Sequence, residues 1–133
     1  MNSTRLCSGL TALILLTASA TLAAADMPAP MQPEELKWGP APMLPADVQM
    51  TLLAGDPASS GLVSLRLKLA PGAKIPPHWH PTDEHVTVIS GTLGLGMGDM
   101  LDKKKSKVLR AGGYAVVPAK MNHFAWTKTG AVV

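Results

Sequence analysis

Hydrophobic and polar residues alternate most regularly between positions 62 and 69. The apolar members of this stretch are Val63, Leu65, Leu67 and Leu69, and the polar members are Ser64, Arg66 and Lys68. Successive side chains of a β-strand point to opposite faces, so this pattern predicts a strand with one buried and one solvated face. The Pro-Gly pair that follows predicts the turn that ends the strand.

Short apolar runs of a similar kind continue to the end of the chain. We expect further strands at residues 48–54, 85–89, 92–97, 107–109, 114–117 and 123–127. No stretch after residue 47 shows helical periodicity of useful length. Short strands at this spacing predict an all-β sandwich or barrel. Glycines 94, 96 and 98 alternate with apolar residues, which predicts either a close approach of another segment or space inside the barrel.

Residues 1–25 differ from this β-rich region. They hold a single charge, Arg5, ahead of an apolar run over residues 10–16, and the alanines at 23–25 offer a small-residue cleavage site. This order predicts a cleaved secretory signal peptide. An uncleaved membrane anchor is the alternative, although the apolar run is short for a span and is diluted by Thr. We therefore expect an exported protein, periplasmic or secreted, with no stable membrane anchor after cleavage.

The rest of the chain divides at its prolines. Residues 26–46 hold six prolines, which predicts an extended N-terminal arm without regular structure. Within this arm, Trp38 is expected to plug the rim or the core of the domain and not to act as a ligand platform. Residues 47–133 then form the β-barrel, because a chain of 133 residues has room for one domain.

Composition excludes several classes of protein. An apolar content of 47% argues against disorder of the whole chain. The single cysteine, Cys7, lies in the predicted leader, so the mature chain has neither a disulfide nor a thiolate zinc site. The net charge of +3 comes mostly from the lysines of residues 102–107, which predict a solvated loop. That charge is too small and too local to indicate a nucleic-acid partner.

All four histidines lie between residues 78 and 123. His78 and His80 are two residues apart, and the prolines around them keep the segment out of a helix, so both imidazoles are expected on one side of an extended backbone. Glu84 follows beyond a turn, and His123 begins a later strand, from which it can close a site across the barrel. Three neutral imidazoles and a carboxylate suit a divalent transition metal. The alternative is that each histidine is an ordinary surface or core residue.

Two segments carry a resemblance to a known family. Residues 72–91 read GAKIPPHWHPTDEHVTVISG and residues 112–123 read GGYAVVPAKMNH, and they resemble the first and second motifs of the cupin superfamily. The resemblance covers roughly residues 48–133 and implies a cupin-type double-stranded β-helix, which is a small jelly-roll barrel. It also implies that one divalent transition metal ion (Fe, Mn, Ni, Cu or Zn) is bound inside the barrel by His78, His80, Glu84 and His123.

The chain departs from these motifs in two ways. Lys120 stands where the second motif often has glycine, and Thr127 where it often has asparagine, so the turn before His123 is expected to differ while metal binding persists. Residues 131–133 look like a strand cut short. Either a partner subunit supplies the last strand, as in a homodimer, or the gene product is truncated.

The alternation of side chains along a strand predicts where the side chains next to these candidate ligands point. His85 and Trp79 are expected to point away from the metal, and Phe124 and Trp126 to lie on the face opposite His123. Asp83 is expected to be an exposed turn residue.

The resemblance implies three classes of function for the metal site. The first is a metal-dependent enzyme, dioxygenase-like or of the isomerase or lyase type, acting on a small organic molecule. The second is a non-catalytic ligand-binding or sensory protein, and the third is a barrel whose metal is structural. A fold that hosts many functions does not choose among them.

Overall fold

The computed structural model describes residues 29–133, so the predicted signal peptide lies outside the described residues. Strands dominate this part of the chain, and its two helices are single 3₁₀ turns, η1 (Pro33–Glu35) and η2 (Lys103–Lys105). None of the helices in residues 29–133 has the length and apolar character needed to cross a membrane. The strands are β1 (Gly39–Pro40), β2 (Val48–Ala54), β3 (Ser64–Leu69), β4 (Lys74–His78), β5 (Glu84–Thr87), β6 (Ser90–Met97), β7 (Ser106–Arg110), β8 (Tyr114–Val117), β9 (His123–Trp126) and β10 (Ala131–Val132).

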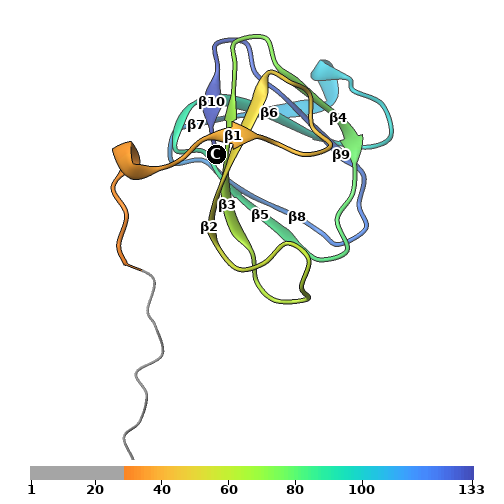
Figure 1. The fold of residues 1–133 in the computed structure, drawn as a ribbon. Helices are drawn as coiled ribbons and strands as arrows, with labels where there is room; N and C mark the ends of the chain where they lie inside the picture. Colours follow the sequence, from red (N-terminus) through yellow and green to blue (C-terminus); the bar gives the residue numbers. More distant parts are fainter. Residues whose placement is uncertain (1–28) are drawn as a thin grey trace, which may run out of the picture.

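The strands form one large curled sheet and one small sheet (Figure 1). Hydrogen bonding links the large sheet in the order β1-β2-β3-β10-β6-β9-β4, with β7 paired to β6 beside this path, and the small sheet consists of β5 and β8. Every pairing in both sheets is antiparallel. This single-domain jelly-roll arrangement confirms the predicted all-β barrel.

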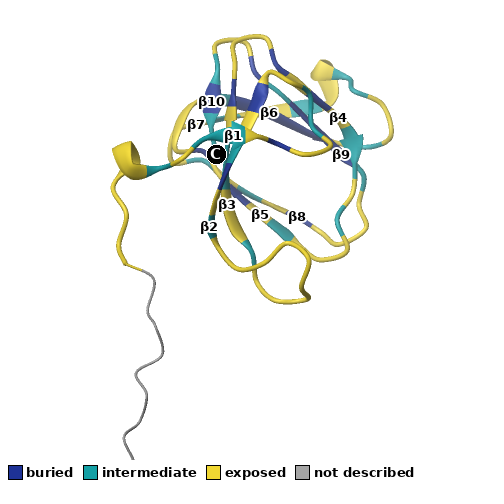
Figure 2. Cartoon of the chain, in the orientation of Figure 1, coloured by how far each residue is buried: buried dark blue, intermediate teal, exposed yellow. Residues whose placement is uncertain are grey.

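The core lies between the two sheets and draws on most of the strands. Figure 2 shows the buried positions on the strands and mostly exposed positions on the connecting loops. The largest fully buried aliphatic side chains are those of Leu93, Val48, Val88 and Val117. Burying an aliphatic side chain of this size stabilises the fold by roughly 1.5–3 kcal/mol. Burial of these side chains therefore fixes which face of each strand points inward.

The closing strand of the barrel comes from this chain. Ala131 in β10 pairs with Leu69 on one side and with Gly91 on the other, so β10 fills the position between β3 and β6. The backbone of Val133 continues this ladder through two hydrogen bonds of 3.0 Å with Leu67. The sequence predicted a partner-supplied last strand or a truncation. In the structure two residues of β10 are enough to pair with both neighbours.

The N-terminal arm is more regular than its prolines predict. Gly39 and Pro40 form β1, which pairs with Met50 and Gln49 of β2. Proline lacks an N–H, and β1 lies at the edge of the sheet, where that missing donor costs little. Trp38 is half-buried beside this strand, as predicted for a rim residue.

Glycines allow two aromatic rings to pack on the outer face of β6. A Cβ atom at Gly94 would lie 2.2 Å from the ring of Trp126, and one at Gly96 would lie 2.3 Å from the ring of Phe124. Both rings belong to β9 and point away from the side on which His123 lies. The prediction for these aromatics is confirmed, and glycines 94 and 96 serve a close approach of the rings.

The loop before β7 covers this aromatic pair from outside. Lys103 places its Nζ 4.6 Å from the centroid of the Trp126 ring, and the indole Nε1–H of Trp126 donates a hydrogen bond of 2.8 Å to Oγ of Ser106. The lysine-rich segment at residues 102–107 was predicted to be a solvated loop. In the structure, part of it forms η2, and Lys103 packs on the ring of Trp126.

Candidate metal centre

Three histidines and a glutamate meet inside the barrel. His78 ends β4, His123 begins β9, Glu84 begins β5, and His80 lies in the connection between β4 and β5. The ring centroids are 4.2 Å apart for His78 and His123, 4.9 Å for His78 and His80, and 5.3 Å for His80 and His123. One ring nitrogen from each histidine lies within 4.8 Å of the others. The structure therefore brings the three predicted histidines together, and Glu84 joins them through contacts with His123 and His80.

A bulge in β4 directs His78 into this cluster. Ile75 pairs with Ala125 and His78 pairs with His123, so two residues of β4, both prolines, stand opposite one residue of β9. The extra residue reverses the alternation of side chains, and Ile75 and His78, three positions apart, consequently line the same cavity. His123 joins the site from the neighbouring strand, and the predicted approach from across the barrel is wrong in this respect.

Backbone carbonyls fix the orientation of two of the imidazoles. Nδ1 of His78 lies 2.9 Å from the carbonyl oxygen of Pro76, and Nδ1 of His123 lies 3.2 Å from that of Met121. A carbonyl oxygen only accepts hydrogen bonds, so each Nδ1 carries a proton, and Nε2 is the ring nitrogen of each residue that is oriented to bind a metal. Ring N–H groups anchored in this way are typical of metal-ligating histidines.

His80 supplies the clearest sign that a further group belongs here. Its Nε2 is buried and has no hydrogen-bond partner among the described residues, since the nearest carboxylate oxygen, Oε2 of Glu84, is 3.8 Å away. A buried polar atom without a partner is costly, and native structures contain few of them. A cation bound by this nitrogen, together with ring nitrogens of His78 and His123, would give it a partner, so the donor set fits a divalent transition metal.

Glu84 and His123 form the tightest contact of the cluster. Oε2 of Glu84 lies 3.0 Å from Nε2 of His123, whose side chain is only 3% exposed. Burial by itself raises the pKa of Glu84, but the hydrogen bond from His123 and the nearby imidazoles outweigh it, and the pKa lies below its usual range. Burial lowers the pKa of His123, but its bonds to Glu84 and to the Met121 carbonyl outweigh that effect and raise the pKa above the ordinary value.

His78 differs from His123 in this respect. Burial lowers the pKa of His78, and the neighbouring His123 and His80 lower it further, against the opposing effect of the Pro76 carbonyl. The neutral form of His78, which is the form that binds a metal, is therefore favoured at neutral pH.

The loop before His123 is tied to the segment that carries the other ligands. The Lys120 N–H donates a hydrogen bond of 2.7 Å to the carbonyl of His80, and the Ala119 N–H donates one of 2.8 Å to Oδ1 of Asp83. Asp83 is exposed, as predicted, but its carboxylate holds this loop in place. Sequence spacing gave no sign of that role, because the contact joins residues 36 positions apart.

A cavity of about 450 Å³ opens beside the four residues. Strands β2, β3, β4 and β6 contribute half of its apolar lining residues, and Leu65, Leu67 and Leu69 line it together, which confirms the predicted face of β3. Trp79 also lines the cavity while remaining 56% exposed, so the prediction that it points away is wrong. β4 ends at His78, and the alternation of strand side chains does not extend to Trp79.

His85 does not line the cavity, and its Nδ1 lies 2.6 Å from the hydroxyl of Tyr114.

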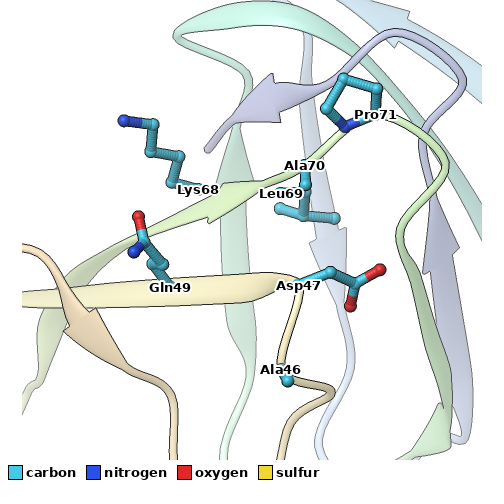
Figure 3. Close-up of a pocket in the computed structure, with 7 residues that line it drawn as sticks. All are labelled: Ala46, Asp47, Gln49, Lys68, Leu69, Ala70 and Pro71. Atoms are coloured by element: carbon cyan, nitrogen blue, oxygen red, sulfur yellow. The ribbon is translucent and has the colours of Figure 1, made fainter.

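A second hollow of about 380 Å³ lies where β2 begins and β3 ends (Figure 3). Its ionisable side chains are those of Asp47 and Lys68, which Figure 3 shows pointing in different directions. Because these groups do not converge, the histidine-lined cavity is the candidate functional site.

Comparisons with known proteins agree with this geometry. The profile of the Cupin family matches residues 57–133. Germin-like protein 3-1 of Oryza sativa subsp. japonica is 39% identical over 69 residues, which cover 51% of this chain and 31% of that protein. Germin-like protein subfamily T member 2 of Arabidopsis thaliana is 40% identical over 67 residues, covering 50% of this chain and 30% of that protein. The chain spans about a third of the length of these relatives.

Solved structures show the same fold at low identity. The polyketide cyclase RemF from Streptomyces resistomycificus superposes with a TM-score of 0.64 at 19% identity, over 80% of this chain and 74% of that one. An RmlC-like cupin from Shewanella frigidimarina NCIMB 400 gives a TM-score of 0.61 at 20% identity, over 77% of this chain and 82% of that one. Since the family profile covers more than half of the residues, and the fold and both motifs agree with it, this chain belongs to the cupin family.

Proposed function

We propose that this chain is an exported cupin that binds one divalent transition metal and, beside it, a small organic molecule. The metal ligands are His78, His80, Glu84 and His123. The observation that supports this most directly is the buried Nε2 of His80, which has no partner among the described residues and belongs to a group of three histidines with ring nitrogens within 4.8 Å of one another.

Each ligand has a distinct task in this proposal. The three imidazoles supply neutral nitrogen donors, and the Glu84 carboxylate neutralises one of the two positive charges. A divalent ion bound here acts as a Lewis acid that polarises an oxygen atom of a bound molecule or of water. The carbonyls behind His78 and His123 keep both rings oriented, so the chain holds the donor set in place before the ion arrives.

The cavity favours a ligand-binding or catalytic role over a purely structural metal. A metal that only braces the barrel requires no adjoining space, whereas here about 450 Å³ adjoins the ligand set. That volume lies within the range of small-molecule sites, which is roughly 300–1,000 Å³. An enzyme of the dioxygenase, isomerase or lyase type and a non-catalytic binding protein both fit this cavity.

Elemental analysis tests the proposal. The full chain is produced in a bacterial host, purified from the periplasm without chelator, and assayed for iron, manganese, nickel, copper and zinc. We expect close to one metal equivalent per chain, and a mass that shows removal of about 25 N-terminal residues. A chain that retains its leader and stays in the cytoplasm contradicts the export part alone.

A matched pair of variants separates the site from adventitious binding. The double variant His78→Ala/His80→Ala removes two ligands, whereas His85→Ala removes the one histidine outside the cluster. We expect the metal to be lost in the first and kept in the second, with circular dichroism confirming that both fold. Equal metal content in the two variants rules out the proposed site.

A further inference from the structure

The wall of the histidine-lined cavity is apolar wherever the four candidate ligands do not reach. Among the described residues that line it, only His78, His80, Glu84 and His123 carry a charged, hydroxyl or amide side chain. The other lining residues are aliphatic or aromatic, with Met50, Leu67, Leu69, Ile75, Leu93 and Leu95 forming much of the wall. Away from the mouth, a bound molecule therefore meets polar side chains at one place only.

The mouth of the cavity is apolar as well. Met43 is fully exposed, Trp79 is 56% exposed and Leu65 is 39% exposed, and all three line the cavity. Among the described residues at this rim, Trp79 offers a further side-chain donor, its indole N–H. The apolar lining continues from the wall to the solvent, which suits a molecule whose body is hydrocarbon and extends toward the mouth.

The charge of the site limits the ligand further. A divalent ion with Glu84 leaves a net charge of +1 beside the neutral imidazoles, and one anionic oxygen group neutralises it. A second anionic group on the same molecule finds no partner, because none of the lining residues within positions 29–133 is a lysine or arginine. Burying an unpaired charge is strongly unfavourable. The cavity thus favours monoanions over dianions.

We infer that this cavity selects molecules with an apolar body and a single oxygen-donor group, and that it discriminates against small dicarboxylates. This inference rests on the proposed metal site, since the ion supplies the attachment point for the oxygen. It narrows the proposed function from a small organic molecule to a monofunctional, predominantly hydrophobic one.

Calorimetric titration of the metal-loaded full chain with two matched series tests the inference. The monocarboxylates are propionate, butyrate and hexanoate, and the dicarboxylates are succinate and adipate, which have the carbon numbers of butyrate and hexanoate. We expect affinity to rise about threefold per methylene along the first series, because each methylene is removed from water. Each dicarboxylate is expected to bind at least tenfold more weakly than the monocarboxylate of the same length.

A cation placed in the wall should reverse this preference. Leu65→Arg introduces a positive charge at the partly exposed end of the cavity, and Leu62→Arg introduces the same charge at a residue that is 91% exposed and does not line it. We expect the affinity ratio of adipate to hexanoate to rise at least fivefold in Leu65→Arg and to stay unchanged in Leu62→Arg.

The outcomes distinguish the inference from the proposed function. A metal-loaded protein that binds dicarboxylates as tightly as monocarboxylates, or that binds neither series, overturns the inference and leaves the metal site in place. A protein that takes up no metal overturns the proposed function, and the inference fails with it.

Discussion

At the scale of single residues, Lys120 shows how this chain differs from the common second motif of its family. Its φ of +62° lies in the left-handed region, which glycine adopts freely and which costs other residues roughly 1–2 kcal/mol. The turn before His123 therefore has a backbone conformation that glycine adopts freely, although the residue here is lysine.

Replacing Lys120 with glycine should stabilise the protein. The relief of backbone strain exceeds the added freedom of the unfolded chain, so we expect a gain of about 0.5–1 kcal/mol in the free energy of unfolding. Urea denaturation measures it as a higher midpoint with an unchanged slope. Lys120→Ala removes the same charge but keeps the Cβ atom, and it should bring no gain. Equal stabilisation by both variants would assign the effect to charge.

The contact between Glu84 and His123 predicts the titration of the metal-free protein. The carboxylate raises the pKa of His123, so Glu84→Gln should lower that pKa toward and below the ordinary value, because burial then acts with less opposition. The pH dependence of the His123 ring signals in NMR spectra of chelator-treated protein measures the change. An unshifted His123 would show that the 3.0 Å contact does not persist in solution.

At the scale of secondary structure elements, β6 depends on its glycines. An alanine at position 96 would place a Cβ atom 2.3 Å from the Phe124 ring, and Phe124 is fully buried. We expect Gly96→Ala to destabilise the fold by about 1–3 kcal/mol, which is typical of overpacking. Gly39→Ala is the matched control, because nothing lies within 4 Å of its added Cβ. Similar midpoints of thermal unfolding for the two variants would contradict this packing.

The elements that the sequence predicted well are short apolar or alternating runs bounded by turn residues. Strands β2, β3, β6, β8 and β9 lie within one or two residues of their predicted bounds, and residues 107–109 lie inside β7. A strand at β4 was not predicted, because Pro76 and Pro77 interrupt its hydrogen-bonding pattern. Two facts of tertiary structure make these prolines acceptable: β4 is an edge strand, and the prolines occupy its bulge. Neither fact can be read from local sequence.

The same limit applies to the site. Local spacing placed His78, His80 and Glu84 together, and the resemblance to the two cupin motifs added His123 to the ligand set. The reversal of alternation at the bulge, the inward position of Trp79 and the contact of Asp83 with the loop before His123 depend on how segments pack. These features became visible only in the folded chain.

At the scale of the whole molecule, the candidate ligands connect the two sheets. His78 and His123 belong to the large sheet, whereas Glu84 begins β5 of the small sheet. The ladder between β5 and β8 is short, running from the pair Glu84 and Val117 to the pair Thr87 and Tyr114. A metal held by all of these residues therefore acts as a bridge between a large, extensively paired sheet and a small one.

Metal removal should accordingly lower the local stability of the small sheet more than that of the large sheet. A ligand that binds only the folded state stabilises it by roughly 3–4 kcal/mol when its free concentration is 100 to 1,000 times the dissociation constant. We expect amide hydrogen exchange to accelerate at least tenfold in β5 and β8 after chelation. Exchange in the paired strands β2 and β3, which hold none of the ligands, should change much less.

In His78→Ala/His80→Ala, chelator should alter neither region, whereas His85→Ala should behave like the unmodified chain. Uniform acceleration across all strands would mean that the ion stabilises the fold without bridging the sheets, and no change in any strand would contradict the metal site itself.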